Sequence, residues 1–501
     1  MFALDRTLRR CRLAFVQGLM IVLASCGGGE AGPDGRPDAG TGNPLRQEQA
    51  QASGHPDAAT PGLQRRSERA GSAEQESAAV AVAWFELLYE RVKAERLSPP
   101  VAARTYGIVG VALYEAVVPG MPGNRSLAGQ LNDLAHMPPQ RHGLRHDWPL
   151  VANSALATTL RQLLAGGSAE TRSAIDALEQ RFFDELQTHL RAADLHRDAT
   201  REIERSIGRG REVGAAVLRW ADSDGYRDLH DCPYARPAGP GLWEPTAPAF
   251  AANPLEPCWG RLRPMAVATD AVCAPPGPPE YSEQPGSLFM TQAQEVYDAV
   301  LARTPEQETV ARYWADEPGR TGTPPGHWMA ITGQILKSDG LSLAAAAEAY
   351  ARVGIAVNDS FIACWRTKYM VNLVRPVSVI RKLIDAAWLP VINTPPFPEY
   401  VSGHSTQSAA ASVLLTDMFG TKAFTDTTHA DHGSVPALEP RRFNSFFEAA
   451  GEAAISRLYG GIHFRAAVAH GVDQGLCIGR QILRKVEFRK RSGREDSRAA
   501  P

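Results

Sequence analysis

Apolar residues recur every three or four positions along most of the chain, with charged residues between them. This spacing gathers the apolar side chains on one face of an α-helix, so it predicts amphipathic helices. The predicted helices are Ser77–Glu95, Pro100–Val118, Ser168–Ala193, Asp198–Asp222, Gln292–Arg303, Glu306–Ala315, Leu341–Asp385, His404–Phe419, Arg441–Tyr459 and Phe464–Val486. Alternating strand patterns are nearly absent, and we therefore expect an all-α protein built as a helical bundle.

Two internal stretches lack this periodicity. Residues 26–76 are rich in Gly, Pro, Ala, Gln and Ser, and they hold too few large apolar side chains to offset the entropy of ordering, so they predict a disordered tether. Residues 225–287 are dense in Pro and Gly and should wrap the helical body, with their tryptophans as packing anchors. The expected organisation is then an N-terminal helical part (77–224), the wrapping segment, a C-terminal helical bundle (288–490) and a disordered tail (491–501).

The first residues have the order of an export signal. Arginines precede the apolar run Leu13–Leu23, and small residues follow it. The sequence Leu23-Ala24-Ser25-Cys26 resembles the lipobox of bacterial lipoproteins, in which the cysteine is lipidated after cleavage, so residues 1–25 are predicted to be a lipoprotein signal peptide. A plain signal peptide or a short anchor helix is the alternative. A lipidated Cys26 would hold the exported protein at a membrane, on the periplasmic or outer-membrane face, without a spanning helix.

Export also sets the expectation for the cysteines. An oxidising compartment allows a disulfide between Cys232 and Cys258, although spacing does not prove that connectivity. Cys364 and Cys477 lie in apolar helical patterns and are expected to be buried thiols.

The overall charge indicates that any basic site is local. The chain of 501 residues has 53 Lys and Arg against 55 Asp and Glu, which gives a net charge of −2. This balance excludes a protein that binds nucleic acid or acidic lipid over its whole surface.

Candidate chemistry concentrates in three segments of the last third. In the first, Lys368 and Arg375 are seven residues apart, which on one helix places both on the same face, about 10.5 Å apart along the axis. In the second, Ser402, Gly403 and His404 begin a helix after a proline-rich stretch. They offer a hydroxyl, an open backbone N–H and an imidazole at a helix N-terminus, where anions bind. A solvated basic face and a simple helix cap are the structural alternatives.

The third segment holds Arg457 and His463 on either side of paired glycines. The glycines should end one helix and let His463 point back toward Arg457 as the next helix begins, although an ordinary helix junction has the same pattern. The three segments together supply fixed cations, a hydroxyl, a backbone donor and imidazoles. Clustered cations repel zinc, whereas guanidinium, ammonium and N–H donors suit a tetrahedral oxyanion. We infer a phosphate-like ligand, with one histidine attacking or coordinating its central atom and the other transferring protons.

These three segments resemble the signature shared by the vanadium-dependent haloperoxidases and the type 2 phosphatidic acid phosphatases. Flanking sequences resemble the secreted bacterial haloperoxidase branch: Tyr313-Trp314-Ala315-Asp316, Gly322-Thr323-Pro324-Pro325, Phe361-Ile362-Ala363-Cys364-Trp365 and Pro395-Pro396-Phe397-Pro398-Glu399-Tyr400. The similarity covers roughly residues 80–487 and implies the helical bundle of that superfamily.

The resemblance implies a role for each site residue. His463 would be the axial ligand of vanadium, and His404 would be the acid/base catalyst. The vanadate oxygens would be bound by Lys368, Arg375, Ser402, the Gly403 N–H and Arg457. Family members orient the acid/base histidine with a carboxylate, for which Asp316 is the candidate here and Glu317 the alternative.

Other positions bear on the reaction. Trp365 and Phe397 match the halide pocket of chloride-oxidising members, so oxidation of chloride is conceivable. Val401 replaces the proline usually found before Ser-Gly-His, which should loosen the turn without removing a ligand. Many phosphatases carry an aspartate that supports the final histidine as a nucleophile, and here that position is Ala467, which argues against phosphatase chemistry.

The leading hypothesis is therefore a vanadate-dependent haloperoxidase that uses hydrogen peroxide to convert a halide to hypohalous acid, which then reaches an organic acceptor. The rival is a periplasmic acid phosphatase in which His463 attacks the phosphorus of a phosphate ester and forms a phosphohistidine, without vanadate. A third possibility is a surface lipoprotein that binds an anion without catalysis. Nucleic acid is not an expected partner, and membrane contact is expected only through Cys26. Family members often form homodimers, for which the sequence gives no interface signal.

Overall fold

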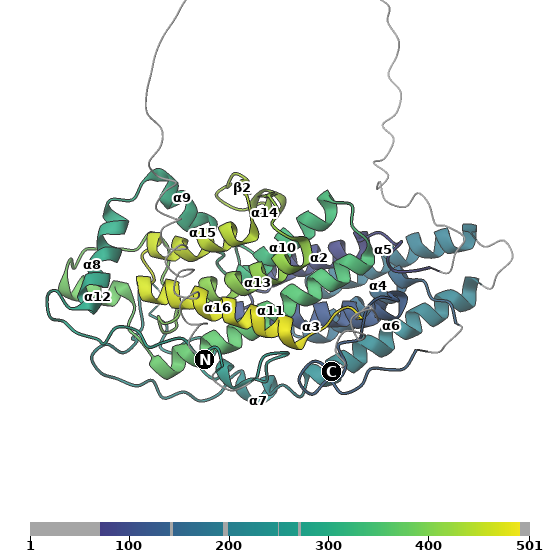
Figure 1. Ribbon diagram of the computed structural model, residues 1–501, viewed down its shortest axis with the longest axis horizontal. Coiled ribbons are helices and arrows are strands. Elements are labelled where there is room, and N and C mark those ends of the chain that lie inside the picture. Colours follow the sequence, from purple (N-terminus) through teal and green to yellow (C-terminus); the bar gives the residue numbers. More distant parts are fainter. Residues whose placement is uncertain (1–70, 141–143, 194–198, 249, 269–271, 491–501) are drawn as a thin grey trace, which may run out of the picture. The chain divides into compact units, whose positions relative to one another are not determined.

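Helices make up most of the described chain, as the hydrophobic spacing predicted (Figure 1). The computed structural model describes residues 71–140, 144–193, 199–248, 250–268 and 272–490. The predicted signal peptide, the lipidated Cys26, nearly all of the tether and the C-terminal tail lie outside these residues. All described residues fall in one structural unit, Thr60–Pro501.

The N-terminal helical part is built around a buried helix, α3. Its helices are α2 (Ala79–Ala94), α3 (Pro99–Val117), α4 (Trp148–Leu163), α5 (Ala169–Ala193) and α6 (Ala199–Ala221). The Ser98 hydroxyl accepts the N–H of Val101 and so caps α3, and prolines occupy the first turn, where their missing N–H costs nothing. Among the described residues only the α3 stretch, Pro99–Gly120, is long and apolar enough to cross a membrane, but it lies mostly buried inside the fold as a core helix.

The wrapping segment is largely irregular, as predicted. It contains only the short helix α7 (Tyr226–Leu229) and a 3₁₀ turn, Trp259–Arg261, among its described residues. Trp243 and Trp259 are buried, which confirms that they anchor the segment by packing. A side chain at Gly260 would lie within 2.4 Å of the Arg366 backbone, so only glycine allows this turn to approach α11 so closely.

Disulfides fix the same segment at two points. The predicted Cys232–Cys258 bond is confirmed. The expectation of a free Cys477 was wrong, because Cys477 of α16 pairs with Cys273 across a sequence separation of 204 residues. Cys364 is a buried free thiol, as predicted.

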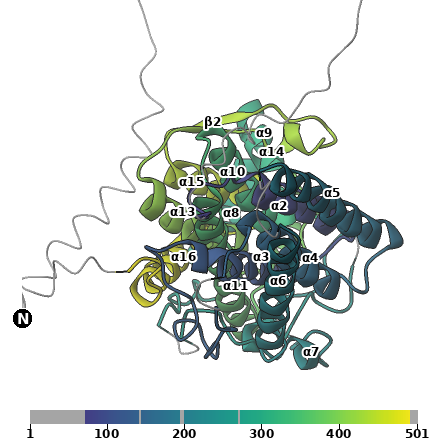
Figure 2. The ribbon, with the colours of Figure 1, turned by 90° about the vertical axis from the view of Figure 1, so that its right-hand side faces the viewer.

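The C-terminal bundle carries the remaining elements. They are α8 (Leu288–Leu301), α9 (Pro305–Tyr313), α10 (Thr323–Ser338), α11 (Leu343–Val371), α12 (Pro376–Leu383), α13 (Gly403–Phe419), β1 (Phe424–Asp426), α14 (Thr428–Asp431), β2 (Arg441–Phe443), α15 (Phe446–Tyr459) and α16 (Arg465–Lys485). The long helix α11 packs against α3 on one side and α13 on another, and α13 in turn contacts α15 and α16 (Figure 1, Figure 2). This packing brings the ends of four C-terminal helices together.

Two predicted helices were wrong in their extent. The single helix Leu341–Asp385 is broken, because Asn372 adopts a left-handed conformation with φ of 53° and ends α11. Pro376 forces the preceding Arg375 into an extended conformation, and α12 starts there in a new direction. The predicted helix Arg441–Tyr459 begins instead as strand β2, which pairs antiparallel with β1.

Candidate active site

The three predicted segments meet where α11, α13, α15 and α16 come together. Lys368 lies in the last turn of α11 and Arg375 at the N-terminus of α12. Arg457 lies in the last turn of α15, and His463 lies just before α16. All four side chains are buried. Lys368 and Arg375 do not share a helix face as expected, yet the break at Asn372 still leaves both beside the same histidine.

Lys368 holds the turn that leads into α13. Its Nζ donates to the carbonyls of Pro398 at 3.0 Å and Glu399 at 2.9 Å, and also to the carbonyl of Val401. Burial, together with the charge of Arg375, lowers the pKa of Lys368 to about 7. A buried ammonium with a lowered pKa is stabilised by an anion nearby.

The two arginines keep donors unpaired. Arg375 donates from Nε to the Phe397 carbonyl at 2.9 Å and from Nη1 to the Ile462 carbonyl at 2.9 Å. Its buried Nη2 has no hydrogen-bond partner among the described residues, and neither has the buried Nε of Arg457. Burial lowers the pKa of each arginine to about 10. Because buried donors nearly always find an acceptor, these atoms indicate room for a ligand with anionic oxygens.

His463 is held by a carboxylate that the sequence analysis gave no role. Its Nδ1 lies 2.9 Å from Oε1 of the fully buried Glu399, which also accepts the N–H of Phe464 at 2.8 Å. Its Nε2 lies 3.2 Å from Nη1 of Arg375, so Nε2 accepts and the proton resides on Nδ1. Burial and the nearby cations hold the pKa of His463 well below its usual range. The ring is therefore neutral, and its Nε2 lone pair can bind a metal.

Ala467 does not leave His463 without a carboxylate partner, contrary to the expectation from the sequence, because Glu399 supplies one from another segment. The sequence signal was a lone acid within a proline-rich, otherwise apolar run. The ring of His463 contacts Arg375, and the charge of Arg457, toward which it was expected to point, also acts on it.

His404 faces the same region, but Asp316 does not orient it directly. A ring nitrogen of His404 bonds to the Trp314 carbonyl, which also accepts from Nη1 of Arg457, and Nε2 of His404 is buried without a partner among the described residues. Burial and the charge of Arg457 hold the pKa of His404 well below its usual range. The predicted hydrogen bond from Asp316 is not formed, because the chain turns at Asp316, with φ of 47°, and places its carboxylate against His327.

The alternative carboxylate, Glu317, does not reach His404 either. It accepts from the side-chain amide of Asn393 at 3.0 Å and pairs with Arg320 at 3.4 Å. Both Asp316 and Glu317 act instead on Arg457, whose pKa their charges raise against the lowering by burial.

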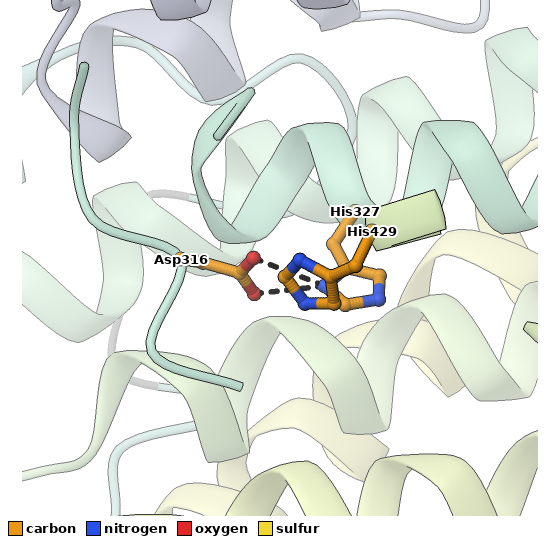
Figure 3. Close-up of side chains that lie close together, drawn as sticks. All are labelled: Asp316, His327 and His429. Atoms are coloured by element: carbon orange, nitrogen blue, oxygen red, sulfur yellow. Dashed lines mark hydrogen bonds and ion pairs between the residues drawn. The ribbon is translucent and has the colours of Figure 1, made fainter. Parts of the chain in front are cut away.

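Asp316 belongs to a buried charge cluster beside the site (Figure 3). His327 contacts Asp316 through Nδ1 at 2.9 Å and Asp426 through Nε2 at 2.7 Å. Burial lowers the pKa of His327, but the two carboxylates outweigh it and raise the pKa to about 10, so the ring is an imidazolium. The Trp314 ring stacks on His327 with a centroid separation of 4.5 Å.

This cluster does not suit a metal ion, although ligand atoms of Asp316, His327 and His429 lie within 4.8 Å of one another. Both ring nitrogens of His327 are taken by carboxylates. His429 donates to the Tyr313 carbonyl at 2.7 Å and accepts from the Ser434 hydroxyl at 2.6 Å. The cluster is therefore a complete hydrogen-bonded network that stabilises the turn containing Trp314.

The remaining predicted residues line the same region. Ser402 Oγ caps α13 by accepting the Ser405 N–H at 3.3 Å. The rings of Trp365 and Phe397 lie 4.9 Å apart, and Lys368 Nζ lies 5.1 Å from the Phe397 centroid. A side chain at Gly403 would contact the Trp365 ring at 3.5 Å. The aromatic pair thus forms an apolar wall next to the buried cations.

Fold and site together define a helical protein with a buried basic pocket for an oxyanion, next to a neutral histidine. Comparison with known proteins gives the family. The family model of the VCPO second helical-bundle domain matches residues 348–387 and 383–490. The crystal structure of a bacterial vanadium-dependent iodoperoxidase is 34% identical, covers 82% of this chain and 97% of its own, and has a TM-score of 0.74.

More distant relatives agree. A holo-type bacterial vanadium-dependent chloroperoxidase shares the fold, with a TM-score of 0.59 and 16% identity over 79% of this chain and 96% of its own. Vanadium chloroperoxidase from Curvularia inaequalis is 26% identical over 39% of this chain, and the match spans 44% of that relative's length. The chain belongs to the vanadium-dependent haloperoxidase family, which confirms the resemblance and the all-α fold.

Proposed function

We propose that this protein is a vanadium-dependent haloperoxidase, which oxidises a halide with hydrogen peroxide to hypohalous acid. The observation that carries the proposal is the set of buried, unpaired donors on Arg375 and Arg457 beside a neutral His463. The identity of 34% to an iodoperoxidase supports the same reaction.

The residues fit vanadate. Nε2 of His463 would bind vanadium, and the oxygens would be bound by Lys368, Arg375, Arg457, Ser402 and the Gly403 N–H. Vanadate, when bound, supplies the activation of hydrogen peroxide toward halide. The buried cations Lys368, Arg375 and Arg457 would stabilise the negative charge on the vanadate oxygens.

His404 is our candidate for proton transfer. Its low pKa keeps the ring neutral, and the Trp314 carbonyl holds the ring proton on the other nitrogen. Nε2 can therefore take a proton from peroxide and return it later. Trp365 and Phe397 would exclude water from the place where halide approaches. We propose iodide as the preferred halide, because iodide is easier to oxidise than bromide or chloride. Oxidation of chloride stays a prediction.

Reconstitution tests the function. After incubation with orthovanadate, the purified protein should form triiodide from iodide and peroxide and should brominate a phenol-red type dye. The same protein dialysed free of vanadium should do neither. If the vanadate-loaded protein oxidises no halide but cleaves phosphate esters, the proposal is wrong.

Replacing Glu399 by glutamine tests whether the Glu399 carboxylate orients the His463 ring for vanadate binding. The amide keeps a hydrogen-bond acceptor for Nδ1 but removes the charge, and loss of such a partner typically costs a metal site about 10- to 100-fold in affinity. We expect this loss in vanadate binding measured by isothermal titration, with a matching loss in triiodide formation. Glu295→Gln, at an exposed pair with Arg465, is the matched control. Equal vanadate affinity in the two variants would contradict the role.

A second candidate function is phosphomonoester hydrolysis by the vanadium-free protein. Glu399 favours it, because a carboxylate on Nδ1 would support His463 as a nucleophile toward phosphorus. Hydrolysis of nitrophenyl phosphate that vanadate inhibits, without halide oxidation, would favour this function over the first.

We propose that the protein acts outside the cytoplasm, anchored through a lipid on Cys26. The export signal supports this, and so do the Cys232–Cys258 and Cys273–Cys477 disulfides, which persist in oxidising compartments. Labelling with a radioactive fatty acid, compared with Cys26→Ala, tests the anchor. The homodimer stays a prediction.

A further inference from the structure

A pocket of about 240 Å³ opens next to the candidate active site, and no role assigned above uses it. We call it the side pocket. It is formed by residues of three stretches, 312–321, 391–393 and 429–438. These are the end of α9 with the turn that follows it, the loop before α13, and α14 with the loop toward β2.

The side pocket adjoins the proposed vanadate ligands through two walls. Asp316 and Glu317 line it, and they are the two carboxylates whose charges act on Arg457. On the other wall, the backbone N–H of Ile392 donates to the carbonyl of Gly460, which lies between Arg457 and His463 in the chain. A small molecule in the side pocket therefore lies close behind the residues that hold the oxyanion.

Part of the lining of the side pocket is apolar. The larger apolar residues are Val391, Ile392, Val435, Pro436 and Leu438. Apolar side chains of this kind suit the flat face of a ring. The lining residues from stretches 391–393 and 429–438 include no Lys, Arg, Asp or Glu. A neutral ring packed against these two stretches therefore meets no charged side chain.

The lining of the side pocket also offers a hydrogen-bond acceptor. His429 donates from Nε2 to the Tyr313 carbonyl, so its Nδ1 accepts the hydroxyl proton of Ser434. Ser434 Oγ then keeps its lone pairs for an O–H donated by a ligand. The Arg320–Glu317 ion pair adds a polar edge.

The volume of the side pocket suits a single ring. An apolar cavity of about 150 Å³ holds benzene, so about 240 Å³ accommodates a substituted monocyclic compound but not a large polycyclic one. A flat apolar body with one O–H donor describes a phenol, whose electron-rich ring is also what electrophilic halogen attacks.

We propose that the side pocket binds a monocyclic phenol, which is halogenated there by hypohalous acid released from the adjacent site. This inference rests on the proposed function. A carbon–halogen bond forms as the halogen–oxygen bond of hypohalous acid and a ring C–H bond break. The ring proton and the released hydroxide leave together as water.

Val435→Trp tests the side pocket. Val435 is an exposed lining residue, so the fold should tolerate a larger side chain there, and tryptophan should narrow the opening of the pocket. Val272→Trp is the matched control, at an exposed valine that does not line the pocket. Phenol binding is measured by saturation-transfer NMR without peroxide, and halogenation is followed against phenol concentration with saturating iodide. In the wild type, we expect both phenol binding and the halogenation rate to saturate with phenol concentration. In Val435→Trp, but not in Val272→Trp, the Kd and KM for phenol should rise about tenfold, equivalent to about 1.4 kcal/mol.

Leu438→Ala provides the opposite change. Widening the pocket should lower the KM for a two-ring naphthol relative to that for phenol. The inference is overturned if the rate of phenol halogenation rises linearly with phenol concentration and is the same in Val435→Trp and Val272→Trp. In that case the ratio of ortho to para halophenol should equal the ratio that free hypohalous acid gives in solution.

Triiodide formation by the wild type without phenol separates the two hypotheses. If triiodide forms but phenol does not saturate, the side pocket is not the acceptor site and the proposed function stands. If phenol binds by NMR but no triiodide forms, the proposed function fails.

Discussion

His463→Ala is expected to lose stoichiometric vanadium and to lower halide oxidation by about three orders of magnitude, equivalent to about 4 kcal/mol. Nε2 of His463 is a buried nitrogen of a neutral ring and lies 3.2 Å from Nη1 of Arg375. Alanine would leave the metal without its protein ligand. Vanadium content by elemental analysis and triiodide formation at saturating iodide measure the two effects.

The control for this variant is His432→Ala. His432 pairs with Glu90 and stacks on Tyr89, outside the site, so its loss should leave vanadium content unchanged. Should His463→Ala retain vanadium and oxidise iodide as His432→Ala does, the assignment of the metal ligand would be wrong.

His327→Leu is expected to lower the free energy of unfolding by about 3–5 kcal/mol near pH 7, because it leaves two buried carboxylates without their cation. The raised pKa of His327 stabilises the folded state fully below the unfolded value of 6.5, and this contribution is lost as the pH rises toward about 10. The lowered pKa of Asp426 contributes stability above its ordinary value of 3.8, which is lost as the pH falls. The difference between wild type and variant should therefore shrink in strong acid, and it should also shrink as the pH rises from 6.5 toward about 10.

Denaturant titrations from pH 4 to 10 measure this difference. His429→Gln is the control, since it removes hydrogen bonds of a neutral ring and should cost only about 1–2 kcal/mol. Replacing Asp316 and Asp426 by asparagine in the His327→Leu background should recover much of the loss. Equal stability of wild type and His327→Leu at neutral pH would refute the charge cluster as a stabilising element.

Helix positions followed from the sequence wherever periodicity was long and uninterrupted, as in α3 and α16. Helices α4 and α10 were not predicted, and each has prolines close to its start, namely Pro149 in α4 and Pro324-Pro325 in α10. In both helices these prolines occupy the first turn, where proline is tolerated. The break between α11 and α12 was also missed, since apolar spacing continues across Asn372 while its backbone does not.

The site residues that belong to short sequence motifs could be predicted from the sequence. Lys368, Arg375 and His463 were found because each stands in a recognisable local pattern. Their partners were not, because those contacts join distant segments: Glu399 meets His463 across 64 residues, and Asp426 meets His327 across 99. Asp316 was predicted to contact His404 but contacts His327 instead, because its partner depends on how the turn after α9 lies against α10.

The bond between Cys273 and Cys477 encloses the whole site within one covalent loop. A protease that cuts any exposed bond between these two positions would leave the fragments joined, and they would migrate as one band on a gel until a thiol is added. Lys368, Arg375, Ser402, Arg457 and His463 all belong to this loop, so a nicked molecule keeps every proposed ligand tethered.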